Sequence, residues 1–136
     1  DGSAEWHVYW DAVSANRVWK TNIPIVMCPL DLTNNVPVTS EFFQRIGKQR
    51  RYPLSDLAGQ CYALVIPQDY YFWDVLATAY LAHPEFYQLR EWETVIVTRG
   101  KSQGRTKIQP GGRKIKAMDK VDTEGFYDYI LQQWAR

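Results

Sequence analysis

The sequence of 136 residues has the length of one ordinary domain, and its 46% hydrophobic and 23% charged residues are typical of a folded globular protein, which excludes a disordered chain. Lys and Arg number 16 against 15 Asp and Glu, so the formal net charge is +1. Because the positive charges form no extended basic block, we expect no nucleic-acid partner.

The first elements expected along the chain are a helix and a buried strand. Asp11 is a suitable N-cap for a helix from Ala12 to about Lys20, because its side-chain oxygen can accept from free backbone N–H groups. Ile23 to Leu30 is a short, continuous apolar run, which favours a strand covered on both faces. A helix followed by such a strand indicates an α/β fold.

The middle of the chain is expected to be helical, after a loop from Asp31 to Pro37. The expected helices run from Thr39 or Ser40 to about Gly47, from Leu54 to Val65, and from Val75 to Ala82. Pro67 is expected to end the region of the second helix, because proline cannot continue a helical hydrogen-bond pattern. Asp74 is a candidate N-cap for the third.

Strands and a final helix are expected in the remainder. The expected strands are Phe86 to Thr98, Arg105 to Gln109 and Lys114 to Met118. A last helix, capped by Asp122 or Thr123, repeats Phe126, Ile130 and Trp134 at every fourth position, so one of its faces is apolar.

The cysteines and the hydropathy pattern bear on location. Cys28 and Cys61 each lie in an apolar run, which favours buried reduced thiols over a disulfide and a cytoplasmic location. No apolar stretch approaches the roughly 18 residues of a membrane span, so we expect no membrane partner. The sequence begins with Asp1 rather than Met, which suggests a piece of a longer protein.

Three segments carry the motifs that point to a function. They are Ala4 to Asp11, Val26 to Thr33, and Phe72 to Leu81, the last followed by Pro84 and Glu85. In this order they resemble the ribose-binding segment, the Pro-Leu-Asp strand end and the Asp-headed, Ala-rich helix of the nucleoside hydrolase family. The segments Thr98 to Thr106 and Val121 to Phe126 are similar to the family's glycine-rich turn and to the start of its last helix.

The resemblance extends from about Ala4 to Trp134 and implies an α/β fold with a mixed, mostly parallel sheet flanked by helices. The family is about twice as long, so residues 1–136 would form the C-terminal portion of a single nucleoside hydrolase domain whose N-terminal half is absent. The Asp-rich motif that holds further calcium ligands and the general base would lie in that half. We therefore expect no catalytic residue in this chain, and no activity from it alone.

The resemblance also assigns site residues. Asp74 would be a calcium (Ca2+) ligand, and the metal would fix the ribose hydroxyls and lower the pKa of the attacking water. Glu5 would bind ribose, and His7 stands where the family has a ribose-binding Asn. Trp73 would stack on a purine base, because an indole cannot donate a proton to a leaving base, and Tyr70 would line the nucleobase side.

Simpler interpretations stay open for these residues. Asp74 could be only a helix cap, and Trp73 only a core side chain.

The complete protein is expected to be a cytoplasmic homo-oligomer that cleaves nucleosides to ribose and free base. The alternatives are a catalytically inactive nucleoside- or sugar-binding homologue, and an aromatic-rich protein-interaction domain, since 15% of the residues are aromatic.

Overall fold

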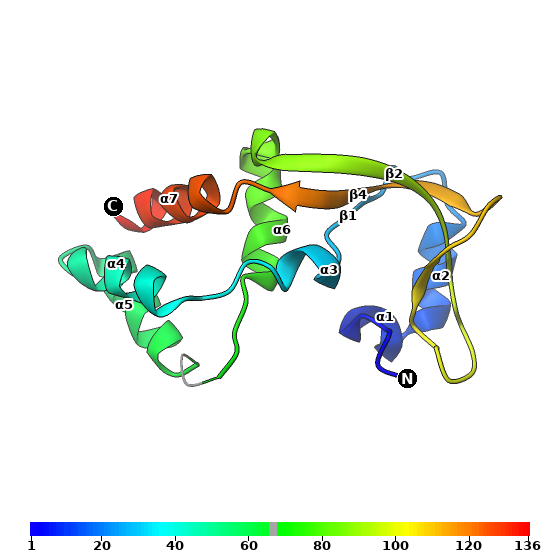
Figure 1. Ribbon diagram of the computed structural model, residues 1–136, viewed down its shortest axis with the longest axis horizontal. Helices are drawn as coiled ribbons and strands as arrows, with labels where there is room; N and C mark the ends of the chain where they lie inside the picture. The colour runs from blue at the N-terminus through cyan, green and yellow to red at the C-terminus, as the bar shows by residue number, and fades with distance from the viewer. Residues whose placement is uncertain (66–67) are drawn as a thin grey trace. The chain divides into compact units, whose positions relative to one another are not determined.

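The computed structural model describes residues 1–65 and 68–136. The chain divides into two compact units, Asp1–Pro29 with Leu89–Asp119, and Leu30–Gln88 with Lys120–Arg136. The elements shown in Figure 1 are α1 Trp6–Trp10, α2 Ala12–Trp19, β1 Val26–Met27, α3 Leu30–Thr33, α4 Ser40–Lys48, α5 Pro53–Ala63, α6 Trp73–Ala82, the 3-10 helix η1 Pro84–Phe86, β2 Tyr87–Ile96, β3 Thr106–Ile108, β4 Arg113–Val121 and α7 Thr123–Trp134.

The described strands form one mixed sheet, in the order β1-β4-β2-β3. β1 is parallel to β4, with Val26 opposite Lys116, and β2 is antiparallel to β3, with Thr94 opposite Ile108. This arrangement confirms the prediction of an α/β fold with a mixed sheet and flanking helices.

In the first unit, side-chain caps set the start of both helices. The Glu5 carboxylate accepts from backbone N–H groups at the start of α1, and Asp11 accepts from the Ser14 N–H at the start of α2, at 2.9 Å. The Trp19 indole donates to the hydroxyl of Thr94 at 2.9 Å, which joins the end of α2 to β2. The predicted cap at Asp11 is confirmed.

The core of the second unit is aromatic. Phe42 and Phe72 are each 1% exposed, and their rings meet edge to face at 5.0 Å. Phe126 on α7 is fully buried and meets Phe72 edge to face at 5.3 Å. Such contacts add to the free energy gained by burying the rings, so α4, α6 and α7 share one apolar core.

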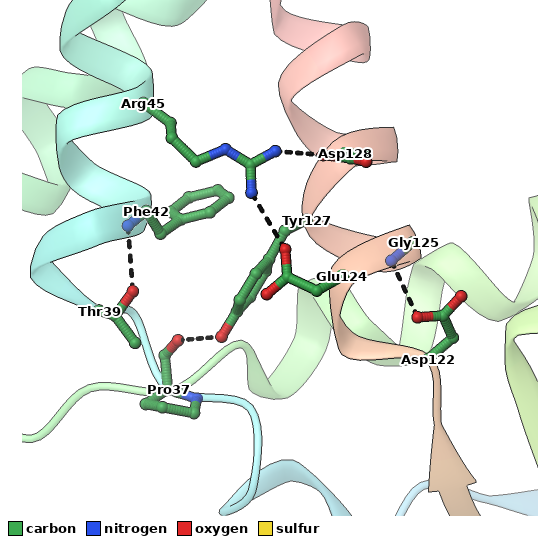
Figure 2. Close-up of polar contacts among 9 residues, drawn as sticks. All are labelled: Pro37, Thr39, Phe42, Arg45, Asp122, Glu124, Gly125, Tyr127 and Asp128. Atoms are coloured by element: carbon green, nitrogen blue, oxygen red, sulfur yellow. Dashed lines mark hydrogen bonds and ion pairs between the residues drawn. The ribbon is translucent and has the colours of Figure 1, made fainter.

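Polar side chains fasten α7 to the neighbouring helices (Figure 2). Arg45 of α4 pairs with Asp128 and, at 3.4 Å, with Glu124. Near the other end of α7, the Ser55 hydroxyl donates to the Trp134 carbonyl at 3.0 Å. The Ser55 hydrogen bond satisfies a carbonyl at the end of α7 that the helix cannot satisfy by itself.

A short pairing of two segments leads into α6. The Val38 N–H donates to the Tyr70 carbonyl at 2.8 Å, and the Phe72 N–H donates to the Val36 carbonyl at 3.1 Å. Between them, Pro37 and Tyr71 form an isolated antiparallel bridge. The backbone just before α6 is therefore held by residues more than thirty positions earlier in the chain.

Several predicted boundaries were wrong. The strand expected from Ile23 to Leu30 is only Val26–Met27, because Pro24 and Pro29 have no N–H to donate to a ladder, and Leu30 already begins α3. α1 was not predicted at all. The expected end of a helical region at Pro67 lies outside the described residues.

The remaining expectations fared unevenly. Cys28 and Cys61 are not in a disulfide, as predicted, but Cys61 is exposed and Cys28 only half-buried, so the expectation of two buried thiols was wrong. Of the two candidates predicted for each cap, Thr39 caps α4 and Asp122 caps α7. Within residues 1–65 and 68–136, none of the helices has the length and apolarity to cross a membrane.

Candidate functional site

In the first unit, Glu5 and His7 are brought together by the first turn of α1. One carboxylate oxygen of Glu5, Oε2, accepts from the N–H groups of His7 and Val8, at 3.0 and 3.2 Å. The other, Oε1, lies 3.4 Å from Nδ1 of His7. The Glu5 carboxylate is thus fixed in orientation by two backbone donors, while Oε1 keeps the capacity to accept from a hydroxyl.

The exposure of these two side chains differs. The Glu5 side chain is 30% exposed and the His7 side chain 74% exposed. The imidazole is mostly in contact with solvent, whereas the carboxylate is held by two backbone N–H groups of the helix. Of the two residues, Glu5 is therefore the better candidate for a fixed contact with a ligand.

In the second unit, Trp73 and Asp74 open α6. The N-cap residue is Phe72, without a side-chain cap hydrogen bond, so the prediction that Asp74 caps this helix was wrong. The chain turns into the helix one residue before Asp74, which leaves this carboxylate within the first turn. A negative charge there is favoured by the free N–H groups of the helix end.

The Asp74 carboxylate is exposed, and among the described residues it makes no hydrogen bond or ion pair. Its oxygens are therefore available to an external partner. A carboxylate is a hard ligand of the kind that calcium prefers.

Two tyrosine rings of the segment before α6 contact the indole of Trp73. The Tyr70 ring meets it edge to face with 4.8 Å between centroids, and the Tyr71 ring lies 5.7 Å away at a tilt of 51°. Tyr62 of α5 contacts Tyr70 in turn, at 6.1 Å. Burial raises the pKa of Tyr62 to about 12. Sequence reasoning missed Tyr62, because no motif or periodicity marks it.

A second oxygen of this unit that could bind a metal was also missed by the sequence analysis. Thr33, at the end of α3, is 2% exposed, and its hydroxyl has no hydrogen-bond partner among the described residues. A buried polar atom without a partner costs free energy unless something else satisfies it. α3 packs against α6, the helix that carries Asp74. The signal was present in the sequence, since Thr33 closes the second of the three motifs.

The carboxylate of Asp74 and the hydroxyl of Thr33 do not make a complete metal site by themselves. Within the described part of the chain, no group of three or more His, Cys, Asp or Glu side chains could hold a metal ion. Calcium takes 6–8 oxygen ligands, so the donors present fit calcium only as part of a larger ligand set. Glu5 and His7 belong to the first compact unit, and Tyr70, Trp73 and Asp74 to the second.

Comparison with known proteins decides the family. The model of the inosine-uridine preferring nucleoside hydrolase family matches residues 1–128, almost the whole chain. The chain belongs to this family. The resemblance that the three motifs indicated is therefore confirmed.

Curated relatives in this family differ in base preference. The non-specific ribonucleoside hydrolase RihC of Salmonella paratyphi A is 26% identical, over 98% of this chain and 46% of its own length. The pyrimidine-specific ribonucleoside hydrolase RihA of Klebsiella pneumoniae is 29% identical, over 98% of this chain and 47% of its own length. The chain thus spans about half the length of the curated relatives that it matches.

Solved structures agree with the fold. The inosine-uridine preferring nucleoside hydrolase from Bacillus anthracis is 38% identical, with a TM-score of 0.92 over 99% of this chain and 44% of that one. The purine-preferring ribonucleoside hydrolase from Gardnerella vaginalis is only 16% identical and shows the fold alone, with a TM-score of 0.78 over 97% of this chain and 46% of that one.

Proposed function

We propose that this chain is the C-terminal portion of a nucleoside hydrolase that cleaves the N-glycosidic bond of nucleosides, and that it supplies ribose contacts, a base-stacking surface and one calcium ligand. The observation that carries the proposal is the Asp74 carboxylate, exposed and unpaired among the described residues, at the head of α6 in a chain that belongs to this family.

The reaction sets what the complete site must contain. Water adds to the anomeric carbon of ribose, the bond to the base nitrogen breaks, and the base leaves with the bonding electron pair and takes up a proton. The transition state carries positive charge on the sugar, so a base for water and groups that hold the ribose are both needed. Bound calcium would lower the pKa of the attacking water and bind ribose hydroxyls.

The residues of this chain would hold the substrate and the metal. Asp74 would bind calcium through its carboxylate, and the unpartnered hydroxyl of Thr33 offers a further oxygen. Glu5 would accept a hydrogen bond from a ribose hydroxyl through Oε1. The general base and the remaining calcium ligands belong, in this proposal, to the preceding half of the complete protein.

Trp73 favours a purine substrate. The N–H of an indole is too weakly acidic to protonate a leaving base, so the contribution of Trp73 is stacking, worth on the order of 1–3 kcal/mol per base, and purines offer the larger ring system. The complete protein should therefore show a higher kcat/KM for inosine than for uridine. Equal values or a preference for uridine would contradict this part of the proposal.

The decisive experiment replaces Asp74 with Asn in the complete protein. The substitution keeps the shape of the side chain but removes its charge, so calcium should bind far more weakly and kcat should fall by several orders of magnitude. Calcium affinity is measured by titration calorimetry and turnover with inosine. A matched control is Asp69→Asn, since Asp69 is also exposed and without a hydrogen bond in the described part of the chain. Calcium affinity and turnover that are equal in the two variants would refute the ligand role.

A second candidate function is a nucleoside-binding homologue that does not catalyse hydrolysis. The observation that favours it is His7, an exposed imidazole at a position where the family has an amide that binds ribose. This alternative predicts that the complete protein binds inosine without releasing base. Release of hypoxanthine at any rate above the uncatalysed reaction would exclude it.

A further inference from the structure

The turn between β2 and β3 lies against the backbone of α1. Its residue Gly104 is buried and has φ +87, a conformation that residues with a side chain rarely adopt. A Cβ built on Gly104 would lie 2.5 Å from Cα of Tyr9 and 2.7 Å from its backbone nitrogen. The contact is with main-chain atoms, so no change of rotamer can relieve it.

Tyr9 connects this contact to Glu5. The Tyr9 N–H donates to the carbonyl of Glu5 at 2.8 Å, the bond that closes the turn of α1. The same turn presents the backbone donors that orient the Glu5 carboxylate. A shift of Tyr9 would therefore move Glu5 with it.

Gly104 is in turn fixed to the sheet. Its N–H donates to the Val97 carbonyl at 2.7 Å, just after the end of β2, and the Val97 N–H donates to the Arg105 carbonyl at 2.9 Å. A second tie joins the turn to the segment before α1, since the Ser102 hydroxyl donates to the Asp1 carboxylate. The turn is therefore held to the end of β2 and to the segment before α1, and α1 packs directly against it.

We propose that Gly104 is a positioning residue for ribose recognition: the absence of a side chain lets the β2–β3 turn set the distance of α1 from the sheet, and thereby the place of the Glu5 carboxylate. This inference rests on the proposed role of Glu5 in binding ribose. It adds a determinant that contacts no substrate.

The expected size of the effect follows from the contact. A side chain at position 104 must push the Tyr9 backbone away by about 1 Å to reach an ordinary separation, and a displacement of about 1 Å at a binding group can cost on the order of 100-fold. We therefore expect the ribose affinity of Gly104→Ala to fall by about 10- to 100-fold.

The test compares Gly104→Ala with Gly100→Ala in the complete protein with calcium. Gly100 lies in the same turn at φ +83, but a Cβ there meets nothing within 4 Å, so this control carries the backbone strain without the displacement of α1. Dissociation constants for ribose and for free hypoxanthine are measured by tryptophan fluorescence, together with KM and kcat for inosine. Gly104→Ala should weaken ribose binding and raise KM while leaving the affinity for hypoxanthine unchanged, and Gly100→Ala should change none of these.

Two outcomes overturn the proposal: wild-type ribose affinity in Gly104→Ala, or equal losses for ribose and hypoxanthine. If Gly104→Ala does not fold, Ser102→Ala removes the hydrogen bond from the turn to the Asp1 carboxylate without adding atoms, and it should weaken ribose binding by about two- to tenfold. An unchanged ribose affinity in that variant would then overturn the proposal. The variant Glu5→Gln distinguishes the role of Glu5 from the role of Gly104. If Glu5→Gln leaves the ribose affinity unchanged, the role of Glu5 in binding ribose is refuted. If Glu5→Gln weakens ribose binding but Gly104→Ala does not, only the positioning role of Gly104 is refuted.

Discussion

The hydroxyl of Tyr127 should stabilise the segment that precedes α6. It donates to the Pro37 carbonyl at 2.6 Å, as Figure 2 shows, and Pro37 is bridged to Tyr71, two residues before Trp73. The hydroxyl is protonated at physiological pH and so can donate, and burial raises the pKa of Tyr127 further above its usual value. Tyr127→Phe removes this one oxygen and leaves the ring in its place.

The cost can be worked out from the contacts. The Tyr127 side chain is 5% exposed and its ring packs on Phe42 at 4.9 Å, so the phenyl ring keeps its packing and only the hydrogen bond is lost. A hydrogen bond of this kind contributes about 0.5–1.5 kcal/mol net, and a carbonyl left dry costs about 1–3 kcal/mol. Because Pro37 is only half-buried, water can reach its carbonyl, and we expect a loss of about 1 kcal/mol.

Urea unfolding of the complete protein measures this loss. The matched control is Tyr129→Phe on the same helix, because the Tyr129 ring contacts His83 while its hydroxyl makes no hydrogen bond among the described residues. The control should stay within about 0.5 kcal/mol of the wild type. If Tyr127→Phe costs no more than Tyr129→Phe, the Pro37 contact contributes nothing and the reasoning fails.

Two further predictions concern the aromatic core. Phe126→Ala should lower the free energy of unfolding by about 3–5 kcal/mol, because removal of this fully buried ring would leave a cavity. A loss smaller than that of Tyr127→Phe would mean that neighbouring side chains move into the cavity, which would contradict the prediction. The raised pKa of Tyr62, about 12 against the usual 10.0, means that the folded state holds this proton more tightly than the unfolded state does. The free energy of unfolding that Tyr62 contributes in this way is fully present below pH 10 and is lost as the pH rises toward 12. In Tyr62→Phe, Tm should therefore fall less steeply over that interval than in the wild type. Equal falls in Tm in the wild type and the variant would contradict this prediction.

Local signals in the sequence predicted the elements whose ends depend on a single cap. Thr39 is the N-cap of α4 and Asp122 the N-cap of α7, and in each case a side-chain oxygen accepts from the N–H three residues later. The family could be predicted for a different reason. Its motifs are spread through the chain in a fixed order, and that order survives where the identity to relatives is low.

Other features could not be predicted from local patterns. α1, Trp6–Trp10, has only five residues, and its N-cap Glu5 is not a common N-cap residue, so neither apolar periodicity nor capping marks this helix. The contact of Trp73 with Tyr70 depends on the pairing of Pro37 with Tyr71, which no local pattern reveals. The start of α6 before Asp74 was missed for the same reason.

The bond from Ser55 to Trp134 has a consequence for how the protein is made. The two residues are 79 positions apart, so α5 leaves the ribosome long before α7 exists to receive the Ser55 hydroxyl. During that interval the apolar side chains of Phe42 and Ile46, which α7 helps to cover in the finished protein, face water or whatever binds nascent chains. The helices of this unit therefore complete their folding only after α7 has been synthesised, and a ribosome that stalls before α7 would release a chain prone to aggregate.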